Sequence, residues 1–172
     1  MDGVATTARM LMVGEPCACG LAVGPGRQHL FWACPVAQAV VDVVNQGLQA
    51  RGPCPPVQQV HIWMARRPSA SLHTKLWLVI SQAALLGMNK GQRTLTALKL
   101  AAFAPGGRHL PGPIREMIAG RVAVATFWDM LADFAGLTSA SQPWIPHVPA
   151  HHPFFQLHTS PAGVRSLRVR RH

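Results

Sequence analysis

Acidic residues are scarce in this 172-residue chain, and tyrosine is absent. The six Asp and Glu residues include no adjacent pair, whereas polymerase and nuclease metal sites need several converging carboxylates. Asp129 and Asp133 lie one helical turn apart, but without a partner histidine or a third acid they are expected on the polar edge of a helix. No Gly-rich phosphate loop followed by Lys-Ser/Thr is present either. The sequence therefore predicts a protein that is not an enzyme.

Long apolar runs are missing as well. The longest, residues 76–88, is interrupted by Ser81 and Gln82 and is shorter than the roughly 20 residues that span a bilayer. The apolar run at residues 10–13 is too short for a signal peptide. Three of the four cysteines lie close together beside a histidine, which does not fit a secreted disulfide framework. We expect an intracellular protein with no membrane partner, and a nuclear one if it binds nucleic acid.

Basic residues outnumber acidic residues by sixteen to six, which gives a net charge of +10. Such an excess favours polyanionic partners, RNA or DNA above all. Because Arg outnumbers Lys thirteen to three, a GC-rich coding sequence is an equally good explanation of the excess. If the charge is functional, the candidate phosphate contacts are Arg27, Arg66, Arg67, Lys90, Arg93, Lys99, Arg165, Arg168, Arg170 and Arg171.

The stretch around which the chain is organised contains Cys17, Cys19, His29 and Cys34. Thiolate and imidazole are the ligands that tetrahedral zinc prefers, and two close pairs separated by a loop can converge on one ion. The one-residue spacer of the first pair is shorter than usual and leaves little room for backbone amides to turn toward the sulfurs. The alternatives are three unligated cysteines with a surface histidine, or a Cys34–His29 nucleophile, which lacks an orienting third group.

The phrase His29-Leu-Phe-Trp-Ala-Cys34-Pro-Val-Ala-Gln-Ala-Val40 resembles the zinc-binding segment that follows the polymerase domain in reverse transcriptases of non-LTR retrotransposons. The resemblance implies one structural zinc ion held by Cys17, Cys19, His29 and Cys34, and a separate polymerase domain as a partner. It also implies help in positioning template RNA or target DNA. Phe31 and Trp32 would then either stack on unpaired bases or pack behind the finger.

Apolar periodicity predicts a mainly α fold: a small CCHC zinc-knuckle-like segment, a four- to five-helix bundle and an irregular Pro/His-rich tail. The expected divisions are a disordered lead (1–16), finger and first helix (17–52), helical domain (53–136) and irregular basic tail (137–172). Pro35 suits a first helical turn, and Gly136 a helix end. Helices are expected near 57–66, 72–88, 94–103 and 114–134, with a break or a kink at residues 89–93.

Five prolines after residue 138 argue against a long regular element in the tail. Trp144, Phe154 and Phe155 are expected to hold this tail against the helices. His147, His151, His152 and His158 offer a second, weaker metal-site hypothesis.

Three functional interpretations remain open from the sequence. The first is a non-catalytic zinc- and nucleic-acid-binding fragment that holds RNA or DNA by backbone contacts. The second is a helical protein-interaction or structural domain with the finger as its cap. The third is a relic of a decayed element, which the short Cys17–Cys19 spacer and the missing enzyme core both favour.

Overall fold

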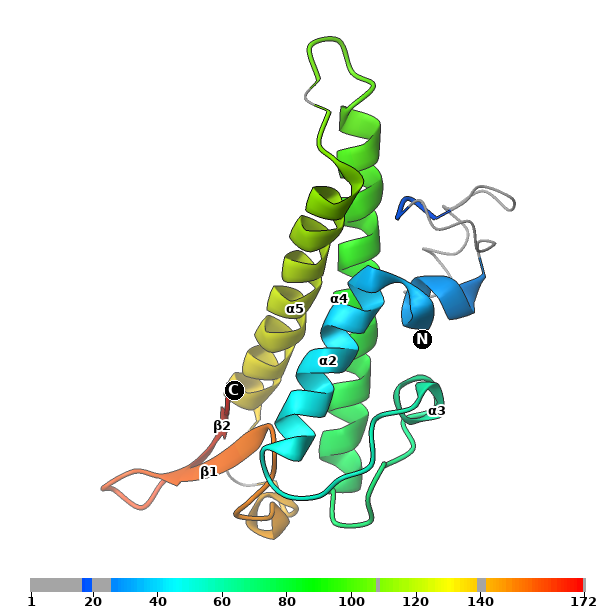
Figure 1. The fold of residues 1–172 in the computed structure, drawn as a ribbon. Coiled ribbons are helices and arrows are strands. Elements are labelled where there is room, and N and C mark those ends of the chain that lie inside the picture. Colours follow the sequence, from blue (N-terminus) through cyan, green and yellow to red (C-terminus); the bar gives the residue numbers. More distant parts are fainter. Residues whose placement is uncertain (1–16, 20–25, 108, 139–141, 172) are drawn as a thin grey trace. The chain divides into compact units, whose positions relative to one another are not determined.

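The computed structural model describes residues 17–19, 26–107, 109–138 and 142–171 (Figure 1). Within these ranges the chain is mainly helical, as predicted, and the number of helices in a bundle stays a prediction. The predicted disordered lead, 1–16, and most of the loop between the two ligand pairs, 20–25, lie outside the described residues. The elements in order are η1 (His29–Ala33), α2 (Pro35–Gln49), α3 (Gln59–Trp63), α4 (Thr74–Ala101), α5 (Gly112–Leu137), η2 (Ile145–His147), β1 (Phe155–Thr159) and β2 (Arg165–Val169).

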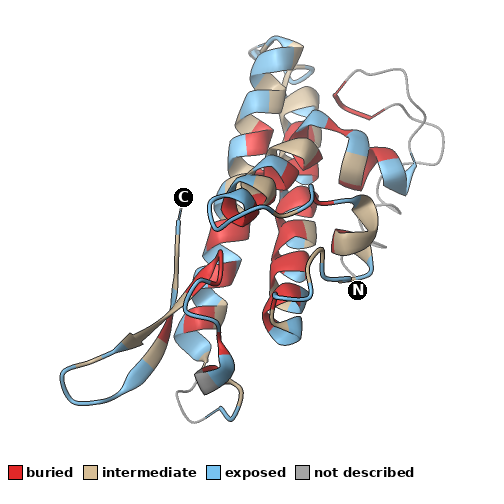
Figure 2. Ribbon diagram, turned by 60° about the horizontal axis from the view of Figure 1, so that its bottom comes forward, coloured by how far each residue is buried: buried red, intermediate tan, exposed pale blue. Residues whose placement is uncertain are grey.

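Two compact units make up the chain, and each is assembled from two separate segments. Unit 1 comprises Met1–Asp42 and Ala84–Phe127, and unit 2 comprises Val43–Ala83 and Trp128–His172. Helices α2, α4 and α5 each contribute residues to both units, and their buried faces are visible in Figure 2. The division into sequential domains at residues 52 and 136 stays a prediction.

Small residues let α4 approach α2 and α5 closely in unit 1. A Cβ atom built at Gly91 would lie 2.5 Å from Val36 Cγ1 and 2.8 Å from the Cβ of Ala123. One built at Gly87 would lie 2.5 Å from the carbonyl oxygen of Ala123. Such separations are shorter than van der Waals contact, so glycine is the residue that permits this packing.

The predicted helix break at residues 89–93 is wrong, because α4 continues from Thr74 to Ala101. Gly91 and the polar residues around it suggested a turn. In the structure Gly91 is needed for close packing rather than for bending, and Asn89 and Gln92 are buried on the same helix. Tertiary packing thus outweighs the low helix propensity of glycine.

In unit 2 the core forms around fully buried aromatic side chains. Trp77 of α4 is completely buried, as predicted, and its indole Nε1 donates a hydrogen bond to the His61 carbonyl at 3.1 Å. The tail is held against α5 by its aromatic residues, as predicted. Phe154 and Trp128 have ring centroids 6.0 Å apart, and Phe155 lies 6.0 Å from Phe134.

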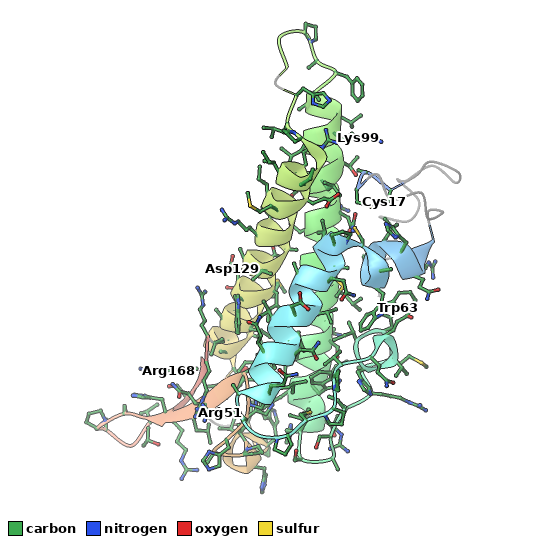
Figure 3. All side chains as sticks on the ribbon, viewed as in Figure 1. Cys17, Arg51, Trp63, Lys99, Asp129 and Arg168 are labelled. Carbon is green, nitrogen blue, oxygen red and sulfur yellow. The ribbon has the colours of Figure 1, made fainter. Side chains whose placement is uncertain are left out.

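The prediction of an irregular tail is wrong for residues 155–169, which form an antiparallel hairpin. Phe155 pairs with Val169, Leu157 with Leu167 and Thr159 with Arg165. The prolines do not prevent pairing because they fall before β1 and in the turn, where Gly163 adopts a positive φ of 79°. Within β2, Leu167 is buried, whereas its neighbour Arg168, on the opposite face of the strand, is exposed (Figure 3).

Candidate metal centre

Cys17, Cys19, His29 and Cys34 converge in unit 1, as the sequence predicted. Their ligand atoms all lie within 4.8 Å of one another. The Cys17 and Cys34 sulfurs are 3.9 Å apart, and the Cys19 sulfur is 3.2 Å from His29 Nε2. A tetrahedral ion with metal–sulfur bonds of about 2.3 Å separates its sulfurs by about 3.8 Å. The cluster can therefore hold one metal ion.

A π-helical turn, η1, brings His29 and Cys34 to the same side of the backbone. The amide of Cys34 donates to the carbonyl of His29 at 2.7 Å, a hydrogen bond five residues long. In an α-helix, side chains five residues apart would point about 140° away from each other. The wider turn reduces this angle, and such turns recur at functional sites. Pro35 begins α2 directly afterwards, as predicted.

Backbone amides do reach the sulfurs, contrary to the expectation for a one-residue spacer. The Cys17 sulfur accepts a hydrogen bond from the backbone of Cys19. The Cys34 sulfur accepts one from the backbone of Val36, in the first turn of α2. Amide donors and the positive end of a helix both stabilise thiolate. The short spacer is thus compatible with the N–H···S pattern of a metal site.

The two closest sulfurs differ in their affinity for protons. The hydrogen bond from Cys17, followed by contacts with Gln92, Val36 and His29, overcomes burial and lowers the pKa of Cys34 to about 5. The same contact with Cys34, together with burial, raises the pKa of Cys17. One sulfur of the cluster is therefore stabilised as thiolate, the form that ligates metals. A bound cation would deprotonate the others.

Gln92 is the site residue that sequence reasoning missed. Its side chain is 2% exposed, its Oε1 lies 3.7 Å from the Cys17 sulfur, and its Nε2 donates to the Leu30 carbonyl at 2.9 Å. It also donates to the Cys34 sulfur. The available signal was its place on an apolar stripe: Met88, Gln92 and Leu95 follow helical spacing, and a glutamine there must be satisfied when buried.

Most features of the cluster fit a structural zinc ion, and one does not. Three thiols and an imidazole, nine-tenths or more buried, match a closed tetrahedral site. Metal-ligating histidines usually donate their second ring N–H to a carbonyl or carboxylate. Nδ1 of His29 is buried and finds no hydrogen-bond partner among the described residues. The ion would be held by Nε2 of His29, while the Nδ1–H on the other side of the ring would lack the acceptor that usually orients a ligating histidine.

Phe31 does not provide a stacking surface for bases, since its side chain is completely buried. Trp32 is partly exposed. Of the two alternatives for these aromatic residues, packing holds for Phe31. Its burial joins the finger to the core of unit 1, so metal binding and helix packing are linked.

The predicted phosphate-contacting residues are divided between the two units. Unit 1 carries Arg27, Lys90, Arg93 and Lys99, and unit 2 carries the six others. Arg27, Lys90 and Arg93 are exposed, and they lie on the segments that supply His29 and Gln92. Lys99 does not join them, because nine residues of continuous helix place it on the opposite side of α4 from Lys90.

Three of the arginines in unit 2 have structural contacts. Nη1 of Arg67 donates to the carbonyls of Ala70 and Leu72, and Nη2 of Arg170 donates to the Ala150 carbonyl. Arg171 lies 3.8 Å from Asp129 in an exposed ion pair. Such a pair contributes little to stability and can exchange its carboxylate for a phosphate. Arg66, Arg165 and Arg168 are exposed.

The tail histidines do not assemble a second metal site. Within the described ranges, the Cys17 cluster is the one group of three or more potential ligands that converges. His152 is buried, whereas His147 and His151 are exposed. The hypothesis of a second ion is therefore wrong for the described part of the tail.

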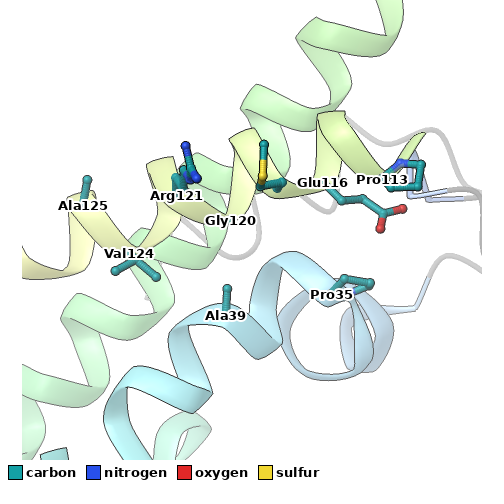
Figure 4. Close-up of a pocket in the computed structure, with 9 residues that line it drawn as sticks. Pro35, Ala39, Pro113, Glu116, Gly120, Arg121, Val124 and Ala125 are labelled. Atoms are coloured by element: carbon teal, nitrogen blue, oxygen red, sulfur yellow. The ribbon is translucent and has the colours of Figure 1, made fainter. Parts of the chain in front are cut away.

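A groove of about 590 Å³ lies between α2 and α5 in unit 1 (Figure 4). Its floor is apolar where Gly120 packs against Ala39, and Glu116 and Arg121 are its charged residues. One carboxylate and one guanidinium without a nucleophile do not make a catalytic set. Across the described residues, no helix is both long and apolar enough to cross a membrane.

Comparison of the chain with protein-family models, curated proteins and solved structures finds no significant match in any of the three. The resemblance to the reverse-transcriptase finger therefore rests on the sequence around residues 29–40, and it stays a prediction. The features that bear on function are the cluster of Cys17, Cys19, His29 and Cys34 and the basic residues on neighbouring segments.

Proposed function

We propose that this chain is a non-catalytic nucleic-acid-binding module stabilised by one zinc ion, akin to the tail of a retrotransposon reverse transcriptase. The observation that carries the proposal is the convergence of Cys17, Cys19, His29 and Cys34 within 4.8 Å. Three sulfurs and one nitrogen in a closed, buried set favour zinc over the harder cations, which prefer oxygen ligands.

Charge next to the cluster supports the nucleic-acid part of the proposal. Arg27 precedes η1, and Lys90 and Arg93 flank the buried Gln92 on α4. A zinc ion would fix η1 and the start of α2, and it would thereby fix the segment on which Arg27 lies. Backbone contacts of this kind hold RNA or DNA with little sequence preference. Such a module would work in the nucleus beside a separate polymerase domain.

Salt dependence of binding tests this proposal directly. Each phosphate contact contributes a slope of about −0.7 for single strands when log K is plotted against log salt. Three contacts in unit 1 predict a slope of about −2 for labelled single-stranded RNA or DNA, followed by fluorescence anisotropy. The Arg93→Gln variant should weaken binding and flatten the slope by about 0.7.

The matched control is Lys75→Gln, an exposed charge on α4 outside the predicted set. It should change the slope less than Arg93→Gln does, and a chelator that strips zinc should weaken binding by the zinc-loaded protein. Absence of any shift at low salt would refute the nucleic-acid role.

Exposed apolar side chains favour a second candidate, a helical protein-interaction domain. Leu100 and Phe103 at the end of α4 are 64% and 79% exposed, and Met117 on α5 is 48% exposed. Exposed apolar side chains mark an interaction site when they form one patch, and this second candidate requires that of these three residues. This candidate is supported if RNA and DNA fail to bind at low salt while Phe103→Ser reduces self-association or partner capture.

The short Cys17–Cys19 spacer no longer favours the interpretation of the chain as a relic, because these two cysteines still converge with His29 and Cys34.

A further inference from the structure

A pocket of about 290 Å³ lies in unit 2, between the segment after α2 and the segment after η2. Its polar lining consists of Arg51, Ser69, Ser71, His151 and His152. Among the residues that the structure describes, no acidic side chain lines it. A cavity with a cation, hydroxyl groups and imidazoles but no carboxylate favours an anionic ligand.

His152 supplies the second observation. Its Nδ1 accepts hydrogen bonds from the backbone amides of Phe154 and Phe155, each at 3.2 Å. A neutral imidazole that accepts at Nδ1 must carry its proton on Nε2. The side chain is 2% exposed, and Nε2 has no hydrogen-bond partner among the described residues. His152 lines the pocket, so the fold maintains a buried N–H donor without an acceptor on a lining side chain, and a ligand reaches Nε2 once the atoms that cover it move aside.

The protonation state of His152 agrees with this assignment. Burial, with a further contribution from His73, lowers the pKa of His152 to about 4. The ring is neutral at pH 7, so the two backbone hydrogen bonds fix one tautomer. The donor is thus present without any change of charge in the core.

We propose that this pocket binds a phosphate group, either free inorganic phosphate or a phosphate monoester, through Nε2–H of His152 and the guanidinium of Arg51. The hydroxyls of Ser69 and Ser71 also line the pocket and hydrogen-bond to each other at 2.8 Å, so the pair can add one O–H donor. Several donors from different directions suit a tetrahedral oxyanion better than a planar carboxylate with two oxygens. Arg51 is exposed and can approach the ligand from solvent (Figure 3).

Binding rather than reaction is expected at this pocket. Cys54 also lines it, but burial raises the pKa of its thiol, so it remains protonated at neutral pH. The lining residues all belong to unit 2, whereas the metal ligands belong to unit 1. Phosphate binding therefore does not depend on the function proposed above. The phosphorylated end of an RNA or DNA strand is nevertheless one source of a phosphate monoester.

Calorimetric titration of the full chain with inorganic phosphate, in chloride at constant ionic strength and pH 7, tests the proposal. Arg51→Gln and His152→Asn should each weaken a saturable one-to-one binding by at least about tenfold. Asparagine can still accept the two backbone hydrogen bonds but lacks the Nε2 donor. Lys75→Gln, an exposed charge in unit 2 outside both the pocket and the candidate phosphate contacts, should leave the affinity unchanged.

Two oligonucleotides of one sequence, with and without a 5′-phosphate, separate the sources of the ligand. Competition with phosphate by the phosphorylated strand alone indicates a monoester, and competition by neither strand indicates free phosphate. Failure to saturate at about 10 mM phosphate, or equal affinity in the wild type and in Arg51→Gln, would overturn the proposal. Should His152→Asn unfold, which circular dichroism detects, the Arg51→Gln comparison decides.

Discussion

Gln92 reaches the candidate metal centre from α4 and joins it to η1 through the Leu30 carbonyl. Its amide oxygen contacts the Cys17 sulfur, and its amide nitrogen donates a hydrogen bond to the Leu30 carbonyl. The buried Leu30 carbonyl, left without this donor, would destabilise the fold. This single side chain therefore links metal binding to the packing of α4. Residues that support metal ligands in this way are typically as important as the ligands themselves.

Replacing Gln92 with Leu should lower zinc affinity by roughly 10- to 100-fold, because the cluster loses its amide support. The loss of the hydrogen bond to Leu30 should also cost about 1–3 kcal/mol of unfolding free energy. Competition with a chromophoric chelator measures the affinity. Gln82→Leu is the matched control, since Gln82 is exposed on the same helix. Equal zinc affinity in the two variants would show that Gln92 plays no supporting role.

His152 makes stability depend on pH. Its pKa is about 4 in the folded protein against an ordinary value of 6.5, so the unfolded chain binds more protons between these values. The stabilisation is fully present above pH 6.5 and is lost as the pH falls toward 4. The wild type should lose about 2 kcal/mol between pH 7 and pH 5 through this residue.

Urea unfolding at the two pH values, in a buffer without phosphate, measures this loss. His152→Asn should be less sensitive to pH than the wild type by that amount, because asparagine does not titrate. Parallel losses in the two proteins would contradict the burial of a neutral His152.

Among the helices, the close approach around Gly91 is the feature most sensitive to substitution. Gly91→Ala should destabilise the protein by about 1–3 kcal/mol, because the new Cβ would overlap Val36 and Ala123. Gly136→Ala provides the comparison, since no atom of the described residues lies within 4 Å of a Cβ built there. That variant should be neutral or slightly more stable. Thermal unfolding of both proteins tests the packing, and equal melting temperatures would argue against it.

Local patterns in the sequence predicted those helix ends and buried faces that depend on single residues or on apolar spacing. Pro35 at the start of α2, the helix end near Gly136 and the apolar faces around Trp77 follow from backbone and burial rules. Continuity through Gly91 could not be predicted, because it depends on side chains of α2 and α5 far away in sequence. The tail hairpin was missed because its prolines lie outside the strands.

The convergence of the four candidate metal ligands could be predicted from residue type and spacing, because the chemistry of thiols and imidazoles is local. Gln92 could not, since only the folded arrangement brings α4 to the cluster. Lys90 and Lys99 lie on opposite sides of the uninterrupted helix α4, so these two candidate phosphate contacts do not share a face. Composition gives the number of basic residues, but it does not show which of them lie on the same face of the folded protein.

Across the complete chain, the account depends on one ion that holds residues 17–19 against η1 and α2. The zinc content of the purified protein, measured by plasma mass spectrometry, tests this most directly. We predict one zinc per chain in the wild type and in Cys54→Ser, and loss of zinc with reduced helicity in Cys34→Ser. A wild-type protein purified under reducing conditions without bound zinc, or a Cys34→Ser protein that keeps it, would contradict the account.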